Sequence, residues 1–206
     1  MKYIKWKILI ITCLVCLLPI ILGLALWNNL PDRIAIHFDL NNNPDNFATK
    51  GFAVFGFPFL MIAFQCFGCF INDINVRKQG DCIKVERVTK WIIPVISVII
   101  QCLIFGYALG WKVDMRVAAM LVVGGLLVVT GSCLPEIEHI KNYHIDAEKA
   151  RKINRFLGVE TVIMGLLFII STLFPPSLSV VCLFLLIPYT LIGVIYGFKV
   201  GKNKKR

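Results

Sequence analysis

Charge is scarce in this sequence, and acidic charge is scarcer than basic. Charged residues make up 17% of the 206 residues, with 12 acidic side chains and 3 histidines, whereas a soluble domain carries roughly 25% charge. Enzyme motifs are also lacking: there is no G-x-S-x-G, no H-E-x-x-H, no phosphate-binding loop and no pair of carboxylates within an apolar run. We therefore expect a protein that is not an enzyme and that needs no cofactor.

Hydrophobic residues dominate instead, at 58% of the chain with a mean hydropathy of +0.78. They fall in blocks of about twenty residues, the length that crosses ~30 Å of hydrocarbon as a helix. The sequence predicts an all-α integral membrane protein with six transmembrane helices. The blocks run over residues 8–27, 52–71, 91–111, 117–134, 156–174 and 178–198. The first has basic flanks like a signal peptide, but its apolar core is longer, so we expect a retained helix.

The lysines and arginines indicate an orientation. With the N-terminus inside, the inner segments are 1–7, 72–90, 135–155 and 199–206, and they hold 18 of the 22 basic residues. This bias predicts that both termini are cytoplasmic and that the protein lies in the plasma membrane. The net charge of +10 then reflects topology and contact with anionic lipid, and it requires no nucleic-acid partner.

Three parts can be distinguished along the chain. Residues 1–72 form a helix–outer loop–helix module, residues 73–90 a basic cytoplasmic loop, and residues 91–206 a four-helix membrane region. The connections "KVDMR" and "PPS" are so short that the helices they join should be antiparallel neighbours. The first outer loop, residues 28–51, is far longer, which predicts a folded structure there.

Within this loop, "IAIHFDL" alternates apolar and polar residues, as in a short strand. Its two faces would hold Ile34, Ile36, Phe38 and Leu40 on one side and Ala35, His37 and Asp39 on the other. "NNNPDN" supplies turn residues. We predict a small extended or hairpin cap between the first two helices, on the extracellular side.

Three interpretations of the cap remain open. The D-x-N-x-N pattern from Asp39 resembles a calcium loop, but Pro44 replaces the required glycine and Lys50 the final glutamate, so that motif is excluded. His37, Asp39 and Asp45 would be the ligands of an irregular metal site. The cap would otherwise be an exposed turn, or a peptide-binding lip whose strand edge pairs with an extended chain.

Several groups inside the apolar blocks also bear on function. Two C-x-x-C pairs, at Cys13 and Cys66, would form a four-thiolate site if their helices pack together, or are ordinary buried thiols; we predict no metal. Glu160 is an intramembrane acid and so a functional candidate. Gln65 and Gln101 should form hydrogen bonds between helices.

Further polar and small residues have predicted roles. Basic side chains before the fifth block should contact lipid headgroups or a cytoplasmic partner; they are Lys149, Arg151, Lys152 and Arg155. Gly124, Gly125, Gly131 and Gly158 should permit close helix packing. Pro19, Pro58, Pro94 and Pro188 should kink their helices.

The stretch "LPDRIAIHFDLNNNPDNFATKG" resembles the outer-loop signature of bacterial membrane proteins related to SdpI, approximately L-P-x-x-I-P-x-H-[FW] followed by a turn, P-D and a lysine. The matching residues are Leu30, Pro31, Ile34, His37, Phe38, Pro44, Asp45 and Lys50. "GSCLPEIE" and "EKARKINRFLG" resemble two further family motifs. Ala35 replaces the usual proline, Ser132 replaces an asparagine, and the loop between the last two motifs is shorter.

This resemblance implies an immunity protein that protects the cell from a secreted, membrane-active toxin peptide and holds a cytoplasmic transcriptional repressor at the membrane. Because a toxin peptide arrives from outside, we expect the outer loop to recognise it, through Pro31, His37, Asp39, Pro44, Asp45 and Lys50. Two other classes remain open: a small membrane transporter or exporter component that uses Glu160, and a metal-dependent membrane enzyme that uses the outer loop.

Overall fold

The computed structural model describes residues 4–79, 83–136 and 147–202. In order, these ranges form α1 (Trp6–Ala25), β1 (Arg33–Phe38), β2 (Pro44–Thr49), a π-helical turn η1 (Phe52–Gly56), α2 (Phe57–Gln79), α3 (Ile83–Ala108), α4 (Met115–Cys133), a 3₁₀ turn η2 (Leu134–Glu136), α5 (Ala147–Ser171) and α6 (Pro176–Lys202). Six helices in these ranges are long and apolar enough to cross a membrane. The prediction of a mainly helical chain with six apolar helices of membrane-spanning length is confirmed.

Some helices extend well beyond the apolar blocks. α3 begins at Ile83 and α5 at Ala147, each about two turns before its apolar block. A short polar helix after Asp146 that leads into the fifth block was predicted, whereas the early start of α3 was not. Lysine, arginine and glutamate have high helix propensity, so a polar flank continues a helix after its apolar run has ended. The stretch 73–90, expected as a loop, is therefore helical up to Gln79 and again from Ile83. Residues 80–82, 137–146 and 203–206 of the predicted inner segments lie outside the described residues.

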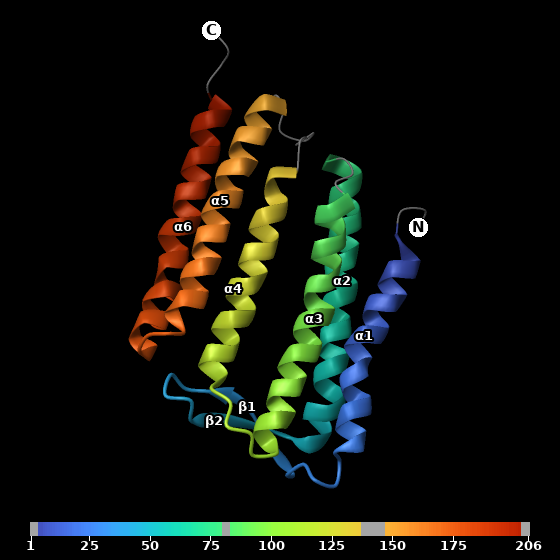
Figure 1. Ribbon diagram of the computed structural model, residues 1–206. Helices are drawn as coiled ribbons and strands as arrows, with labels where there is room; N and C mark the ends of the chain where they lie inside the picture. Colours follow the sequence, from blue (N-terminus) through green and yellow to red (C-terminus); the bar gives the residue numbers. More distant parts are fainter. Residues whose placement is uncertain (1–3, 80–82, 137–146, 203–206) are drawn as a thin grey trace. The chain divides into compact units, whose positions relative to one another are not determined.

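The chain divides into two compact units. Unit 1 comprises Met1–Asp73 and Lys90–Ala118, and unit 2 comprises Ile74–Thr89 and Ala119–Arg206. In unit 1, α1, α2 and α3 lie side by side, and the β1–β2 hairpin lies where α1 and α3 end and α2 begins (Figure 1). A buried apolar cluster joins the hairpin to these helix ends. Its residues are Leu30, Ile34, Ala53, Val54, Ile104 and Phe105.

Two buried prolines in unit 1 each leave a backbone carbonyl without its helical donor. Pro58 follows the π-turn η1, in which an N–H bonds the carbonyl five residues back, so its missing N–H frees the carbonyl of Ala53. The side-chain amide of Gln101, on α3, donates to that oxygen. Pro94 frees the carbonyl of Lys90, four residues back. Gln65, on α2, donates to it at 2.9 Å.

The prolines and glutamines of α2 and α3 are thus complementary: each helix supplies the donor that the proline of the other lacks. Gln65 Nε2 also donates to Thr12 Oγ1 of α1 at 2.8 Å, so one amide links all three helices. The predicted helix-to-helix hydrogen bonds of Gln65 and Gln101 are confirmed. Both side chains are at most 1% exposed, which makes the loss of either amide costly.

This arrangement predicts a non-additive double-mutant cycle. Gln65→Leu should lower the free energy of unfolding by about 1–3 kcal/mol, because the Lys90 carbonyl stays buried without a donor. In a Pro94→Ala background the loss should be smaller, because the N–H of an alanine at position 94 restores the helical bond. Unfolding in detergent measures both losses. Equal losses in the two backgrounds would show that Gln65 does not compensate for the proline.

In unit 2, α4 and α5 touch backbone to backbone at two pairs of glycines. A Cβ added to Gly124 would lie 2.7 Å from the carbonyl oxygen of Gly165, and one added to Gly131 would lie 2.8 Å from that of Gly158. Within each helix the two glycines are seven residues apart, or two turns, so both face the same neighbour. The predicted role in close packing is confirmed for Gly124, Gly131 and Gly158 and is wrong for Gly125, where an added Cβ would meet nothing within 4 Å.

α5 and α6 are antiparallel neighbours across the short link at Pro175, as the length of that link predicted. Their interface carries polar contacts at two levels: the hydroxyls of Thr161 and Tyr189 are 2.7 Å apart, and those of Ser171 and Ser179 are 3.3 Å apart. Hydroxyl pairs of this kind hold membrane helices together, since hydrocarbon offers them no alternative partner.

Candidate functional site

The hairpin consists of β1 and β2, paired antiparallel from Arg33–Thr49 to Phe38–Pro44. Asn42 lies in its turn with a φ of 64°, a conformation that asparagine tolerates better than most residues. The Asp39 carboxylate accepts hydrogen bonds from the backbone N–H groups of Asn41 at 2.9 Å and Asn43 at 2.7 Å. The acid and the asparagines therefore build the turn, as side chains of this type often do.

The predicted alternation of faces along β1 is wrong at two positions. Ile34 and Ala35 are both buried, at 1% and 6% exposure, whereas Ile36 is 38% exposed. The strand register shifts on both sides of His37, and such bulges turn the following side chains away from strict alternation. Only the first part of the strand, near Ile34, contributes to the core.

The base of the hairpin is fastened to the end of α1 through Lys50. Its ammonium lies 3.3 Å from the carbonyl oxygen of Trp27, 3.3 Å from a carboxylate oxygen of Asp32 and 5.3 Å from the centre of the Trp27 ring. The backbone N–H of Lys50 also donates to the carbonyl of Asp32 at 2.9 Å. A cation here satisfies the carbonyl end of a helix, so Lys50 holds the loop in place.

The tip of the hairpin is fastened to the α3–α4 connection through Asn42. Its side-chain amide donates to the carbonyl of Val113 at 2.9 Å, and its side-chain oxygen accepts from the N–H of Met115 at 2.8 Å. The second bond satisfies one of the free N–H groups at the start of α4. Nearby, Phe38 packs edge-on against Tyr107 of α3, with ring centres 4.6 Å apart.

The connection that receives the tip is itself shaped by glycine. Gly110 has a φ of +89°, the left-handed conformation that ends many helices. The N–H of Trp111 then bonds back to the carbonyl of Gly106 at 3.0 Å. The Trp111 ring lies against Gly106 so closely that a Cβ there would be 2.4 Å from it.

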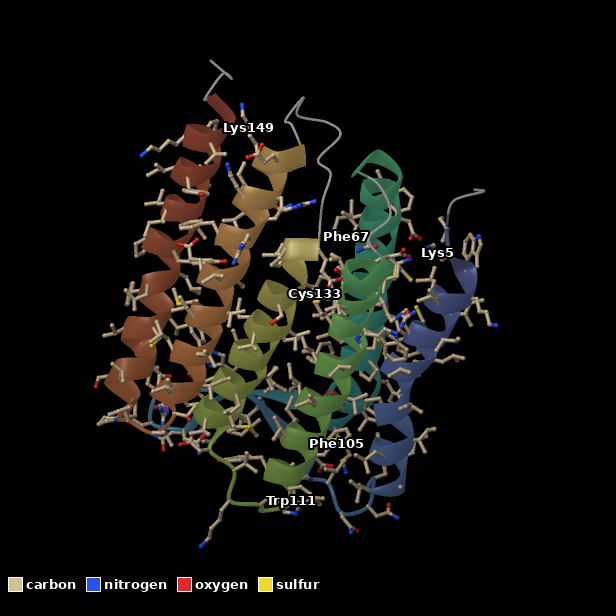
Figure 2. The ribbon with its side chains drawn as sticks, turned by 45° about the horizontal axis from the view of Figure 1, so that its top comes forward. Lys5, Phe67, Phe105, Trp111, Cys133 and Lys149 are labelled. Atoms are coloured by element: carbon tan, nitrogen blue, oxygen red, sulfur yellow. The ribbon has the colours of Figure 1, made fainter. Side chains whose placement is uncertain are left out.

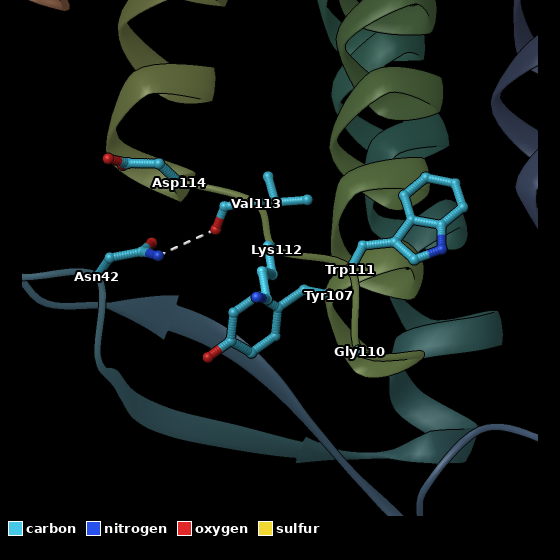
Figure 3. Close-up of a pocket in the computed structure, with 7 residues that line it drawn as sticks. All are labelled: Asn42, Tyr107, Gly110, Trp111, Lys112, Val113 and Asp114. Carbon is cyan, nitrogen blue, oxygen red and sulfur yellow. Dashed lines mark hydrogen bonds between the residues drawn. The ribbon is translucent and has the colours of Figure 1, made fainter.

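A pocket of about 590 Å³ opens beside this contact. It is lined by Asn42, Tyr107, Gly110, Trp111, Lys112, Val113 and Asp114. In Figure 3, Tyr107 and Lys112 lie between Asn42 and Asp114 on one side and Trp111 on the other. The ends of the hairpin are therefore both fixed, and a partly polar pocket lies at the tip.

The two hydrogen bonds and the positive φ of Asn42 predict that two substitutions there differ in how much they destabilise the protein. Asn42→Gly should remove both hydrogen bonds and keep the positive φ, while Asn42→Ala should add strain of about 1–2 kcal/mol. In both variants, hydrogen exchange should show that the N–H of Met115 has lost protection, because its acceptor is gone. Unchanged protection of Met115 in Asn42→Gly would contradict this clamp.

The turn should also respond to acid. The hydrogen bonds to Asp39, chiefly from the backbone of Asn43, hold the pKa of its carboxyl below the ordinary value. Stability from these bonds is complete above the ordinary aspartate pKa, about 3.9, and is lost as the pH falls through the lowered value. The protection of the Asn43 N–H from hydrogen exchange should decrease as Asp39 is protonated in the wild type. In Asp39→Asn this protection should not depend on pH. A pH-independent wild type would contradict the prediction.

Of the other residues predicted for recognition, His37 and Asp45 lie together across the hairpin. His37 Nδ1 donates to Asp45 Oδ1 at 2.5 Å, and the side chains are 67% and 48% exposed. Pro31 is exposed before β1, and Pro44 begins β2. Asp39 does not join the pair, and in the described residues no group of three histidine, cysteine or acidic side chains could hold a metal ion. The irregular metal site is thus not formed.

The four-thiolate site is not formed either. Cys13 Sγ of α1 lies 3.8 Å from Cys66 Sγ of α2, which confirms that the two helices pack together there. Cys69 Sγ instead lies 3.1 Å from Gln65 Nε2. Within the described ranges, no three of these thiols are placed so that they could hold a metal ion.

The predicted functional residues of unit 2 lie on α5. Glu160 is only partly exposed, and its Oε2 atom is buried without a hydrogen-bond partner among the described residues. Arg151, Lys152 and Arg155 are exposed and Lys149 is partly so. Lys152 pairs with Glu148, one turn earlier, at 2.8 Å.

Sequence reasoning missed a buried ion pair in unit 1. Asp73 Oδ1 accepts from the ammonium of Lys90 at 2.5 Å, with side chains 5% and 1% exposed. Asp73 Oδ2 also accepts from the backbone N–H of Lys5 at 3.2 Å. Both residues fall within helices that could span a membrane, whereas the charge count placed them in a loop. The only sequence feature that could have indicated this ion pair is that Asp73 and Lys90 each lie beside an apolar block.

The comparisons with known proteins match the hairpin module alone. Residues 14–62 match a family described as a domain of unknown function, DUF1648. This match covers most of α1, the hairpin and the beginning of α2. No curated protein and no solved structure matches the chain.

Proposed function

We propose that this chain is a non-enzymatic immunity or sensor protein of the plasma membrane, which protects the cell against a secreted, membrane-active toxin peptide. In this proposal both termini are cytoplasmic and the hairpin faces outward as the recognition surface. The proposal rests on the resemblance of the hairpin sequence to SdpI-type proteins and on the basic residues of the inner segments.

The observation that carries the proposal is the way the hairpin is held. Lys50 fixes its base and Asn42 its tip, while the His37–Asp45 pair between them is exposed. A loop that is ordered before binding loses less conformational entropy when a ligand arrives. This combination of fixed ends and an exposed polar middle suits recognition better than mere connection.

An extended peptide is the ligand that the hairpin fits best. In the described part of the chain, β1 and β2 pair only with each other, so each strand offers an outer edge for backbone hydrogen bonds. Peptides commonly bind by adding a strand to such an edge. His37 and Asp45 would then select among peptides through their imidazole and carboxylate groups.

The test is survival in the presence of candidate toxin peptides. Deletion of the gene should sensitise cells to a cognate peptide, and His37→Ala or Asp45→Ala should weaken protection while the amount of protein in the membrane stays unchanged. Lys199→Ala, an exposed lysine on α6, is the matched control and should protect fully. Unaltered tolerance of the deletion strain to every peptide tried would refute the immunity role.

Orientation needs a separate measurement. A cysteine introduced at Asn46, which is exposed in β2, should react with a membrane-impermeant maleimide in intact cells, in a background without the native thiols. One introduced at Lys199 should react only after the membrane is opened. The reverse pattern would place the hairpin in the cytoplasm and exclude recognition of an external peptide.

On the inner side, the basic end of α5 is the proposed contact for a cytoplasmic repressor or for anionic lipid. Arg151 and Arg155 are exposed there, and each exposed cation near an anionic surface contributes about 1 kcal/mol. Replacement of both by glutamine should release a bound repressor, or lower the affinity for anionic lipid, without changing the hairpin. Retention of both kinds of binding would exclude this surface.

A second function is favoured by one observation, the unpartnered Glu160. A carboxylate oxygen buried in a membrane helix without a donor is costly, and such groups mark ion or proton pathways in transporters. Gly193 of α6 lies opposite, and a Cβ there would be 3.5 Å from Glu160 Oε2. Proton-coupled flux in proteoliposomes that Glu160→Gln abolishes would favour a small transporter or exporter component over the immunity role.

A further inference from the structure

The pocket at the hairpin tip has a composition unlike the helix surfaces around it. An ammonium, a carboxylate and a phenol, from Lys112, Asp114 and Tyr107, line the same opening. In the described part of the chain, neither the Lys112 ammonium nor the Tyr107 hydroxyl has a hydrogen-bond or ion-pair partner. Two donors are therefore available to a ligand in the pocket.

Asp114 supplies the opposite charge. Its Oδ1 atom caps α4 by accepting from the N–H of Val117 at 3.0 Å, and its Oδ2 atom lies 3.6 Å from Arg116. That second contact is long for a hydrogen bond, and the Asp114 side chain is 45% exposed. Oδ2 can therefore accept from a further cation.

The position of the pocket relative to the ends of the apolar helices indicates which ligands surround it. The helix that ends at Ala108 and the helix that begins at Met115 could each span the membrane, and the pocket residues 110–114 form the link between them. With both helices across a membrane, this link is placed at the level of the lipid headgroups. Trp111, on the pocket wall, is 64% exposed, as is common for tryptophan at a membrane interface.

The walls of the pocket are fixed before any ligand binds. Asn42 bonds both Val113 and Met115, the Tyr107 ring packs against Phe38, and Gly110 sets the direction of the link. The ligand groups therefore need little rearrangement to bind.

We propose that this pocket binds the headgroup of an amine-bearing phospholipid, a phosphoethanolamine. The Lys112 ammonium and the Tyr107 hydroxyl donate to the phosphate oxygens, and the Asp114 carboxylate accepts from the primary ammonium of the lipid. A headgroup with both charges matches the cation and the anion that line the pocket. A purely anionic headgroup leaves Asp114 without a partner, and a quaternary amine has no N–H to donate to it.

The test is the selective retention of lipid by the full chain in mixed bicelles. The bicelles contain equal amounts of phosphatidylethanolamine, phosphatidylcholine and phosphatidylglycerol, and native mass spectrometry counts the lipids retained after detergent exchange. The wild type should retain phosphatidylethanolamine about tenfold over the other two, the factor that one charge-assisted hydrogen bond supplies. Equal retention of the three lipids would overturn the proposal.

Two variants locate the site. Lys112→Ala should lower the retention of all three lipids, because each of their headgroups carries a phosphate. Asp114→Ser should abolish the preference for the amine while it preserves the cap of α4, because serine is also a good N-cap. Lys199→Ala, a lysine near the end of another membrane helix, should change nothing. A preference for the amine that persists in Asp114→Ser, or lipid retention that Lys112→Ala leaves unchanged, would overturn the assignment.

Two competition experiments distinguish the lipid from the free headgroup and from a peptide ligand. Soluble O-phosphoethanolamine in excess should displace the retained lipid only weakly if the acyl chains contribute, and complete displacement at equal concentration would assign the site to the free headgroup. Displacement of the lipid by a cognate toxin peptide, with no lipid selectivity in its absence, would assign the pocket to the peptide and overturn the proposal.

Discussion

Asp73→Ala is expected to lower the free energy of unfolding by about 3–5 kcal/mol, the cost of removing one member of a buried ion pair. The variant leaves the Lys90 ammonium, whose side chain is 1% exposed, without its carboxylate. It also removes the acceptor of the Lys5 backbone N–H. Unfolding by SDS in mixed micelles measures the loss, and a decrease below about 1 kcal/mol, typical of a surface pair, would contradict the structure.

Paired variants separate the charge from the packing. Asp73→Asn keeps the shape and one acceptor oxygen but removes the negative charge, so it should be nearly as destabilising as Asp73→Ala. Asp73→Leu combined with Lys90→Met should be less destabilising than either single change, because neither charge remains buried. Lys152→Ala is the control: it removes an exposed ion pair with Glu148, one helical turn earlier, and should lower the free energy of unfolding by only about 0.3–0.5 kcal/mol.

The ion pair matters for function because of its position on α3. Lys90 lies near the start of this helix, and Tyr107 and Gly110 lie at its end beside the pocket. Lys5, which the pair contacts, and Trp111, on the pocket wall, lie at opposite ends of unit 1 (Figure 2). A helix that is fixed by a buried charge at one end gives the hairpin tip a rigid support at the other.

Hydropathy was enough to predict the helices, because long apolar blocks have few alternatives in a membrane. The roles of Gln65 and Gln101 were predictable for a similar reason, since a buried amide needs a partner from another helix. The partner carbonyls were not predictable, because they depend on which proline faces which glutamine across α2 and α3.

The details of the hairpin were also beyond sequence reasoning. Asn42 was expected to form a turn, but its partners Val113 and Met115 lie more than seventy residues away in the sequence. Ile36 lies where the strand register shifts before His37, and it is exposed although it was expected on the buried face. A period-two pattern assumes an unbroken register, and one extra residue changes which side chains are buried.

Asp73 and Lys90 were assigned to a loop because the positive-inside rule counts charges beside apolar blocks as solvent-exposed. That rule describes lysines as a population and does not exclude a single lysine that turns inward toward an acid. The pair would have been found only by asking whether α2 and α3 continue as helices beyond their apolar residues, as they do up to Gln79 and from Ile83.

The second large effect is expected at the contact between α4 and α5. Gly124→Ala and Gly131→Ala should each lower the free energy of unfolding by about 1–3 kcal/mol, because the new methyl groups meet backbone atoms that cannot move aside. The nearest are the carbonyl oxygens of Gly165 and Gly158, at 2.7 and 2.8 Å. The two sites are two helical turns, or ~10 Å, apart, so the losses in the double variant should add.

Gly125 provides the matched control, since a Cβ there would meet nothing within 4 Å. Gly125→Ala should be neutral or should stabilise the protein by up to about 1 kcal/mol, because alanine favours a helix more than glycine does. Neighbouring glycines in one helix should thus respond with opposite signs. If Gly124→Ala were as well tolerated as Gly125→Ala, the backbones of α4 and α5 could not be in contact, and these glycines would have no role in holding the helices of unit 2 together.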